Sequence, residues 1–344
     1  MDLAELNRVA TAMVAPGKGL LAADESGGTI AKRFAAIDVE STETNRRDYR
    51  ELLFRSTKAM HDHISGVILF DETIRQKAVD GTPLVKIIEQ AGAIPGIKVD
   101  KGAKSLAFCP GETITEGLDG LRERLAEYRE LGARFCKWRA VINIGSGIPT
   151  YDSISSNAHA LARYAALCQE QGLVPIVEPE VLMDGDHTID RCDEVTEFVL
   201  KTVFQALFTA RVKLEGMVLK PNMIVPGAKC ATQASDEEIA KKTIRVLKDC
   251  VPSAVPGIAF LSGGQADVEA TARLDAMNKI GGFPWHLTFS YGRALQHAPQ
   301  VAWSGKPENV AAAEAAFSHR AEMNGLATLG KWTPDMESTI AQRS

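Results

Sequence analysis

The segment VLKPNM, residues 218–223, places one lysine, Lys220, inside an otherwise apolar stretch that runs from Gly216 to Val225. Burying an ammonium group without a partner is costly, so a lysine in such a position tends to lose its proton. A neutral lysine amine is a nucleophile that forms Schiff bases with carbonyl compounds. The alternative is a strand-end lysine whose long side chain reaches water. Other apolar segments decide between the two, because they show whether polar residues recur at the same relative place.

Eight short apolar runs of this kind alternate with longer helical patterns along the 344 residues. They are rich in Val, Ile, Leu and Phe without clean polar alternation, as in a parallel sheet covered on both faces. We predict strands at Gly19–Ala23, Ser65–Phe70, Gly96–Val99, Arg134–Ile142, Val174–Val181, Met217–Ile224, Ile258–Leu261 and His286–Phe289. We predict helices near Thr42–His61, Thr82–Gln90, Gly117–Leu131, Ser153–Gln171, Ile189–Arg211, Ser235–Cys250, Gln265–Lys279 and Pro307–Met323, and an amphipathic helix within residues 1–17.

This alternation predicts an α/β fold, a (β/α)8 TIM barrel with additional N- and C-terminal helices. A doubly wound parallel sheet is the main rival on pattern alone. The sequence shows no internal repeat, low-complexity block or linker. We therefore expect one domain over residues 1–344, with residues 327–344 as a C-terminal tail.

The composition is that of an ordinary globular protein, 45% hydrophobic and 24% charged. A net charge of -5 argues against a nucleic-acid partner. The six cysteines are scattered without a C-x-x-C pair, which indicates reduced thiols in a cytoplasmic protein. The N-terminus lacks the basic region and apolar run of a signal peptide, and no run of about 18 apolar residues predicts a membrane span.

Seven of the eight predicted strands carry a polar or charged group near the C-terminal end, where the active site of a barrel lies. Each group alone has a structural explanation, such as a salt bridge, a proline kink or a helix cap. Side chains two apart on a strand point to the same face, so two of the strands can each aim a pair of charges into the barrel mouth. The groups are Asp24, Lys98, the pair Lys137 and Arg139, the pair Glu178 and Glu180, Lys220, Ser262-Gly263-Gly264 and Ser290-Tyr291-Gly292-Arg293.

This set of side chains suits imine chemistry. Lys137 beside Lys220 would disfavour the charged form of each lysine, and burial would act in the same direction. A carbinolamine then loses water with the help of a proton donor and acceptor such as Glu178. A carboxylate at Asp24 could take the hydroxyl proton during carbon–carbon cleavage beta to the iminium, which is the electron sink.

Two Ser/Gly turns predict phosphate binding, because the loops after strands 7 and 8 of barrels often bind phosphate at helix starts. Ser262-Gly263-Gly264 and Gly292-Arg293 fit that role. A second cationic set, Arg33 and Lys98 with the turn Ser26–Thr29, could hold another phosphate. Two phosphate sites that flank an imine-forming lysine indicate a doubly phosphorylated carbonyl substrate.

All of these residues except Thr29 and Arg33 lie in segments that resemble class I fructose-bisphosphate aldolase, the metal-free Schiff-base family, over nearly the whole chain. The segments are LLAADES (20–26), GIKVDKG (96–102), GETITEGLDGL (111–121), CKWR (136–139), LARYAALCQEQGLVPIVEPEVL (161–182), LKPNM (219–223), LSGGQ (261–265) and LTFSYGRALQ (287–296). The resemblance implies a (β/α)8 barrel without a metal or cofactor. It also implies reversible cleavage of fructose 1,6-bisphosphate to dihydroxyacetone phosphate and glyceraldehyde 3-phosphate in glycolysis and gluconeogenesis, by a cytoplasmic homotetramer.

The resemblance also implies a role for each residue of the predicted site. Lys220 is the Schiff-base lysine, Glu178 the acid/base for imine formation and dehydration, and Asp24 the carboxylate for the C4 hydroxyl proton, assisted by Lys137. Glu180 is grouped with these catalytic residues. The substrate-binding residues are Arg139 and Ser290, then Ser262, Gly263, Gly292 and Arg293 at the C1-phosphate end, and Ser26, Thr29 and Lys98 at the C6-phosphate end, with Arg33 nearby.

Two alternatives remain open at this point. One is a related Schiff-base aldolase that prefers another phosphosugar, such as sedoheptulose 1,7-bisphosphate or fructose 1-phosphate. The other is a non-catalytic scaffold that keeps the barrel. One departure from the family concerns its C-terminal tyrosine, which assists proton transfer on the enamine. The last tyrosine of this sequence is Tyr291, so that step is expected to use another group or water.

Overall fold

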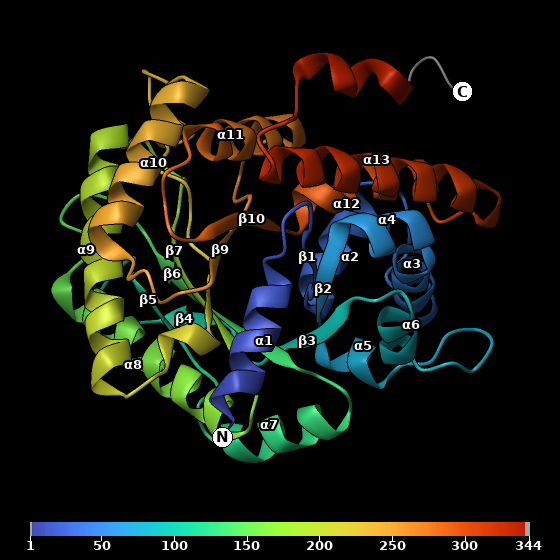
Figure 1. The fold of residues 1–344 in the computed structure, drawn as a ribbon, viewed down its shortest axis with the longest axis horizontal. Coiled ribbons are helices and arrows are strands. Elements are labelled where there is room, and N and C mark those ends of the chain that lie inside the picture. The colour runs from blue at the N-terminus through green and yellow to red at the C-terminus, as the bar shows by residue number, and fades with distance from the viewer. Residues whose placement is uncertain (1, 341–344) are drawn as a thin grey trace.

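The computed structural model describes residues 2–340, and its eight parallel strands close into a barrel in the order β1-β10-β9-β8-β7-β6-β3-β2 (Figure 1). The strands are β1 Gly19–Ala23, β2 Ile64–Leu69, β3 Ile94–Lys98, β6 Phe135–Ile142, β7 Val174–Val181, β8 Val218–Leu219, β9 Gly257–Phe260 and β10 His286–Tyr291. Each strand pairs with its neighbours in parallel, which confirms the predicted barrel and excludes a doubly wound open sheet.

Helices surround the barrel (Figure 1). They are α1 Leu3–Met13, α2 Gly27–Ala35, α3 Glu43–Arg55, α4 Thr57–His63, α5 Asp71–Arg75, α6 Leu84–Gln90, α7 Leu121–Glu130, α8 Tyr151–Glu170, α9 Ile189–Thr209, α10 Asp236–Cys250, α11 Asp267–Ile280, α12 Arg293–Trp303 and α13 Val310–Thr328. Short 3-10 helices lie at Leu214–Gly216, Pro307–Asn309 and Pro334–Ile340. Residues 341–344, the end of the predicted tail, lie outside the described residues.

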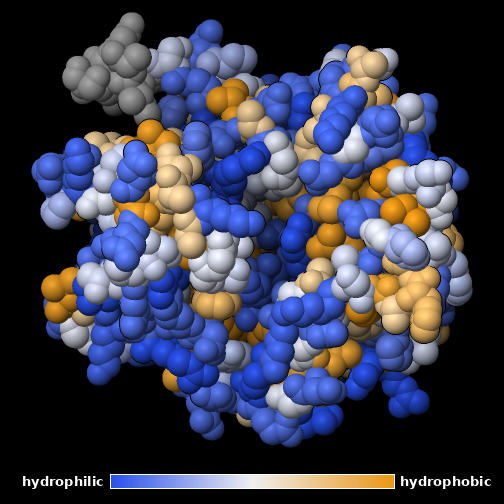
Figure 2. All heavy atoms as spheres, turned by 180° about the vertical axis from the view of Figure 1, so that it is seen from behind, coloured by the Kyte–Doolittle hydropathy of each residue, from blue (hydrophilic) through white to orange (hydrophobic). Residues whose placement is uncertain are grey.

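One end of the barrel is closed by apolar packing. Leu6, Val9 and Met13 of α1 belong to the same buried cluster as the barrel residues Leu20, Ala22, Ile68, Phe135, Val174, Ile176, Val218 and Ala259. Phe135 fills the space beside Gly96, where an added Cβ would lie 2.2 Å from its ring. Figure 2 shows the face opposite that of Figure 1, which is hollowed near its centre and lined there by hydrophilic residues. The polar side chains that line the cavity lie at that open end.

The predicted strand Met217–Ile224 is much shorter in the structure, because β8 ends at Leu219. Lys220 still donates its backbone N–H to the Val177 carbonyl, at 2.8 Å. Pro221 has no N–H to continue the ladder. The side chain of Asn222 then replaces a backbone partner, because its Oδ1 accepts from the N–H of Val181 at 3.0 Å. The chain stays buried here without remaining a strand.

Several predicted helices differ from the structure. The predicted helix Thr42–His61 is two helices, α3 and α4, that meet at Ser56, whose hydroxyl donates to the Leu52 carbonyl at 2.9 Å. The predicted turn Ser26–Thr29 is the start of helix α2, with Ser26 at the N-cap. The predicted C-terminal helix is α13, which continues past Met323 to Thr328. Helices α5 and α12 and the hairpin of β4 (Ala103–Ser105) and β5 (Thr113–Thr115) were not predicted.

Candidate active site

A cavity of about 570 Å³ opens at the C-terminal ends of the barrel strands. All fifteen residues of the predicted site line it, which brings together seven strands or the loops that follow them. The residues are Asp24, Ser26, Thr29, Arg33, Lys98, Lys137, Arg139, Glu178, Glu180, Lys220, Ser262, Gly263, Ser290, Gly292 and Arg293. The residues that the sequence resemblance assigns to the site therefore line one continuous cavity.

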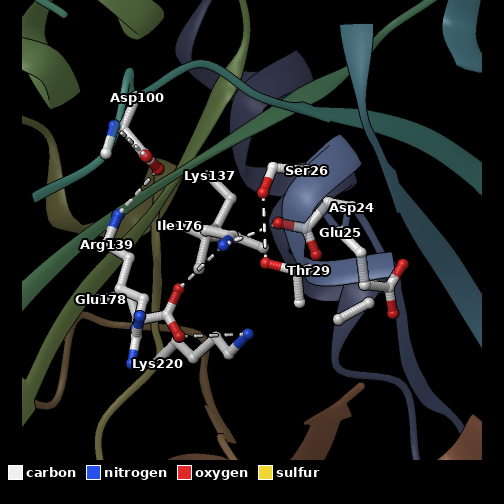
Figure 3. Close-up of polar contacts among 12 residues, drawn as sticks. Asp24, Glu25, Ser26, Thr29, Asp100, Lys137, Arg139, Ile176, Glu178 and Lys220 are labelled. Atoms are coloured by element: carbon white, nitrogen blue, oxygen red, sulfur yellow. Dashed lines mark hydrogen bonds and ion pairs between the residues drawn. The ribbon is translucent and has the colours of Figure 1, made fainter. Parts of the chain in front are cut away.

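Strand geometry explains how the charged side chains reach the cavity. Lys137 and Arg139 lie two apart on β6, and Glu178 and Glu180 lie two apart on β7, so each pair points to one side of its strand. The two strands are paired so that Arg139 lies opposite Glu178. As a result, Lys137, Glu178 and Lys220 converge in Figure 3.

The centre of the site is a buried network of two lysines and two carboxylates (Figure 3). Lys137 Nζ lies 2.8 Å from Asp24 Oδ2 and 3.5 Å from Glu178 Oε2. Lys220 Nζ lies 3.3 Å from Glu178 Oε1. All four residues are at most 8% exposed. Glu178 thus lies between the two lysines, within one proton-transfer step of Lys220.

The environment of Lys220 makes its ammonium group easier to deprotonate than that of an ordinary lysine. Burial is the largest effect and lowers the pKa of Lys220, while the carboxylate of Glu178 opposes it and the ammonium of Lys137 adds to it. The net pKa lies below that of an ordinary lysine. Since only the unprotonated amine attacks a carbonyl carbon, this environment increases the nucleophilicity of Lys220 near neutral pH.

Lys137 behaves differently from the prediction, which was wrong for this residue. Burial disfavours its ammonium form, but the carboxylates of Asp24 and Glu178 outweigh burial and raise the pKa of Lys137 well above its usual range. Lys137 therefore stays charged, so the two neighbouring lysines differ: the pKa of Lys137 is raised and that of Lys220 is lowered.

The carboxylates of Asp24 and Glu178 stay ionised because positively charged lysines lie beside them. Burial would raise the pKa of Asp24, but the positive charges of Lys137 and Lys98, and that of Lys220 when it is protonated, lower it well below the usual range. Burial also raises the pKa of Glu178, and Lys220 with Lys137 outweighs it, so that this pKa is lowered too. The site holds two anions and one permanent cation around the amine of Lys220.

A second ion pair lies next to this network. Arg139 Nε donates to Glu180 Oε2, and the side chain of Arg139 is 41% exposed while that of Glu180 is buried. Asp100 Oδ2 accepts from the backbone N–H of Arg139 at 3.3 Å and also lines the cavity, although sequence reasoning missed it. Its position in GIKVDKG, two residues after Lys98, was the available signal.

The loop after β9 forms a tight turn over residues 262–265. Gly263 adopts a φ of +54°, which favours glycine, and the N–H of Gln265 donates to the Ser262 carbonyl at 3.0 Å. Arg293, at the start of α12, donates to the Gln265 carbonyl at 2.9 Å. Ser290 Oγ is buried and has no hydrogen-bond partner among the described residues. This corner presents backbone N–H groups, a hydroxyl and a guanidinium to the cavity.

In the second cationic region, which holds Arg33 and Lys98, Arg33 forms an ion pair with a carboxylate that the sequence did not predict. Arg33 Nη1 lies 2.5 Å from Glu25 Oε1, which also accepts from Gln296 Nε2 at 2.7 Å. Sequence reasoning missed this role of Glu25. Its side chain points away from that of the adjacent Asp24 (Figure 3). The hydroxyls of Ser26 and Thr29 lie 3.1 Å apart, and Lys98 Nζ lies 4.9 Å from the centre of the Phe70 ring.

Residues 2–340 contain no group of three or more His, Cys, Asp or Glu side chains placed to hold a metal ion. Within the same residues, none of the helices combines the length and apolar character needed to cross a membrane.

Comparison with known proteins gives a consistent result. A family model described as fructose-bisphosphate aldolase class-I matches residues 5–344. A probable fructose-bisphosphate aldolase class 1 of Xanthomonas campestris pv. campestris is 59% identical over 96% of this chain and 99% of that protein. The cytosolic fructose-bisphosphate aldolase 4 of Arabidopsis thaliana is 54% identical over 94% of this chain and 82% of that protein.

A solved structure extends this likeness to three dimensions. Fructose-bisphosphate aldolase of Plasmodium falciparum, solved in complex with TRAP and a small-molecule inhibitor, has a TM-score of 0.94 to this structure. The two chains are 49% identical, and the match covers 96% of each.

Proposed function

Because the chain belongs to the class-I fructose-bisphosphate aldolase family, and is therefore a lyase that cleaves fructose 1,6-bisphosphate, we propose that Lys220 forms the Schiff base through which it acts. The observation that carries this proposal is the lowered pKa of a buried lysine whose Nζ lies 3.3 Å from a carboxylate at the cavity. A neutral amine and an adjacent acid/base are the two groups that imine formation requires.

In the first half of the reaction, the amine of Lys220 attacks the C2 carbonyl of the ketose to give a carbinolamine. Glu178 moves the protons that let this intermediate lose water and become the iminium, a role that its contacts with both lysines support. The iminium then accepts the electron pair of the C3–C4 bond as that bond breaks, and becomes an enamine.

In the second half, Asp24 takes the proton of the C4 hydroxyl as the C4 carbonyl forms. The ammonium of Lys137, 2.8 Å from Asp24, stabilises the negative charge that develops on the C4 oxygen. Glyceraldehyde 3-phosphate leaves, the enamine takes up a proton at C3, and water releases dihydroxyacetone phosphate from Lys220. Glu180 takes part by holding Arg139, which contacts the substrate.

The phosphates of the substrate occupy the two ends of the cavity. We assign the C1 phosphate to Ser262, Gly263, Ser290, Gly292 and Arg293, which the unpartnered hydroxyl of Ser290 supports. We assign the C6 phosphate to Ser26, Thr29 and Lys98. Arg33 lies nearby and must share its guanidinium with Glu25.

Borohydride reduction tests the imine directly. We expect dihydroxyacetone phosphate plus borohydride to add one reduced adduct per chain, located by peptide mass spectrometry on Lys220. Enzyme treated with borohydride alone is the control and should keep its mass. An adduct on another lysine, or no adduct in an enzyme that cleaves fructose 1,6-bisphosphate, would contradict the assignment of Lys220.

We also propose that the enzyme works as a cytosolic homotetramer in glycolysis and gluconeogenesis. An exposed aromatic surface on α8 and α9 supports self-association: Tyr151 and Phe198 are 68% and 45% exposed with ring centroids 6.1 Å apart, and Phe208 is 79% exposed. In sedimentation velocity, we expect the species of four 37.1 kDa chains to shift to smaller species in Phe198→Ser. The matched control, Phe108→Ser, removes a fully exposed aromatic from the β4–β5 loop and should leave the assembly unchanged.

A further inference from the structure

A methionine lies at the proposed C1-phosphate corner. Met183 follows β7 and lines the cavity beside Ser262, Gly263 and Gly264. The backbone N–H of Gly264 donates to Met183 Sδ at 3.2 Å. The same sulfur would lie 3.8 Å from a Cβ added to Gly263. The thioether of Met183 therefore accepts a hydrogen bond from a backbone N–H at the place where a phosphate is expected.

The turn does not depend on this contact for its shape. Gln265 donates to the Ser262 carbonyl both from its backbone N–H and from its side-chain Nε2, each at 3.0 Å. The Gln265 carbonyl accepts from Arg293 at 2.9 Å, and Gln265 Oε1 accepts from Arg273 at 2.8 Å. These four hydrogen bonds hold residues 262–265 together, so the role of Met183 must lie elsewhere.

The chemistry of the contact points to exchange with an anion. A thioether sulfur is a weak acceptor, whereas a phosphate oxygen forms a short, charge-assisted hydrogen bond with the same N–H. Methionine is unbranched and flexible, so its side chain can leave the donor at little conformational cost. Met183 is half-buried, which leaves room for that movement, whereas Met13, Met60, Met217, Met223, Met277 and Met323 are buried.

We propose that Met183 is a displaceable acceptor that occupies the Gly264 N–H in the free enzyme and competes with the C1 phosphate for it. The acceptor strength of residue 183 then sets the affinity for phosphorylated ligands at this end of the cavity. This inference rests on the proposed function, since it assumes that the phosphate of a Lys220-bound ligand reaches the turn at residues 262–265.

Three side chains of similar size and graded acceptor strength test the proposal. Leucine has no acceptor, methionine has a weak one, and glutamine has a strong amide oxygen. We expect the half-saturating concentration of dihydroxyacetone phosphate for the reduced Lys220 adduct to fall about two- to five-fold in Met183→Leu and to rise by a similar factor in Met183→Gln. Dihydroxyacetone, which lacks the phosphate, should trap equally well in all three proteins.

The controls separate competition from a structural effect. Met336→Leu replaces another half-buried methionine, in the 3-10 helix Pro334–Ile340, and should bind dihydroxyacetone phosphate as the unaltered enzyme does. Weaker or unchanged binding of dihydroxyacetone phosphate in Met183→Leu would overturn the proposal, because it would make Met183 a support of the turn or a bystander. A parallel change for dihydroxyacetone would overturn it too.

A second measurement does not depend on the variants. In unaltered enzyme with 13C-methyl methionine, saturation with dihydroxyacetone phosphate should shift the Met183 methyl signal, and dihydroxyacetone should shift it much less. An unmoved signal would contradict displacement. Failure of the proposed function has a different signature, since no Lys220 adduct would then form with dihydroxyacetone phosphate at all.

Discussion

Replacing Lys220 with alanine is expected to abolish cleavage of fructose 1,6-bisphosphate. Without the amine there is no iminium to accept the electrons of the breaking carbon–carbon bond. Loss of a covalent nucleophile typically costs about five to six orders of magnitude in turnover. The rate of triose phosphate release, measured with a coupled assay at saturating substrate, reports the loss.

Two further variants test whether the loss of activity is specific to the amine of Lys220. Lys220→Arg keeps a cation near Glu178 but cannot form an imine at neutral pH, so it should be as inactive as Lys220→Ala. Lys213→Ala removes an exposed lysine a short distance away along the chain and should keep full activity. Turnover in Lys220→Ala clearly above the uncatalysed rate, in protein whose circular dichroism matches the unaltered enzyme, would place the nucleophile elsewhere.

Replacing Glu178 with glutamine should lower kcat by about 10²–10⁴-fold, the usual contribution of a general acid/base. Glutamine keeps the shape and one acceptor oxygen, but it cannot carry the protons that dehydration of the carbinolamine requires. The pKa of Lys220 should fall further, because Glu178 is the carboxylate that opposes the effect of burial. The amine then becomes more nucleophilic while the later step becomes slower.

Rapid-quench borohydride trapping identifies the slowed step, because borohydride reduces the iminium and leaves the carbinolamine untouched. We expect the trapped adduct to accumulate much more slowly in Glu178→Gln than in the unaltered enzyme. Glu180→Gln is the matched control: it removes a buried carboxylate from the same strand, but one that pairs with Arg139 and not with Lys220. If the two variants trapped at the same rate, Glu178 would not be the acid/base for dehydration.

The location of the site was predictable because barrels place strand ends together. Asp24, Lys137, Glu178 and Lys220 each lie within or just after a predicted strand, and closure of the sheet brings them within ion-pair range of one another. The charge state of Lys137 was not predictable in this way. Its pKa depends on which atoms lie within a few ångströms, and the 2.8 Å contact with Asp24 joins residues 113 positions apart.

Local irregularities account for the errors in secondary structure. The apolar pattern continues through Ser56, so nothing in the periodicity reveals the break between α3 and α4. Gly27 and Gly28 are typical of turns, yet here they form the first turn of α2. Helix α12 contains Pro299, a residue that usually argues against a helix interior. In α2 and α12, the local preference of the sequence is outweighed by the rest of the structure.

The backbone bond between Lys220 and Val177 has a consequence for how this enzyme can change. Val177 precedes Glu178 on β7, so one hydrogen bond sets the positions of both the proposed nucleophile and its proposed proton-transfer partner. A single-residue insertion or deletion within β7 would turn Glu178 to the opposite side of the strand. Loops such as residues 106–112 can vary in length without touching this alignment. Among related sequences, the segments 174–181 and 217–220 should therefore vary in composition but not in length.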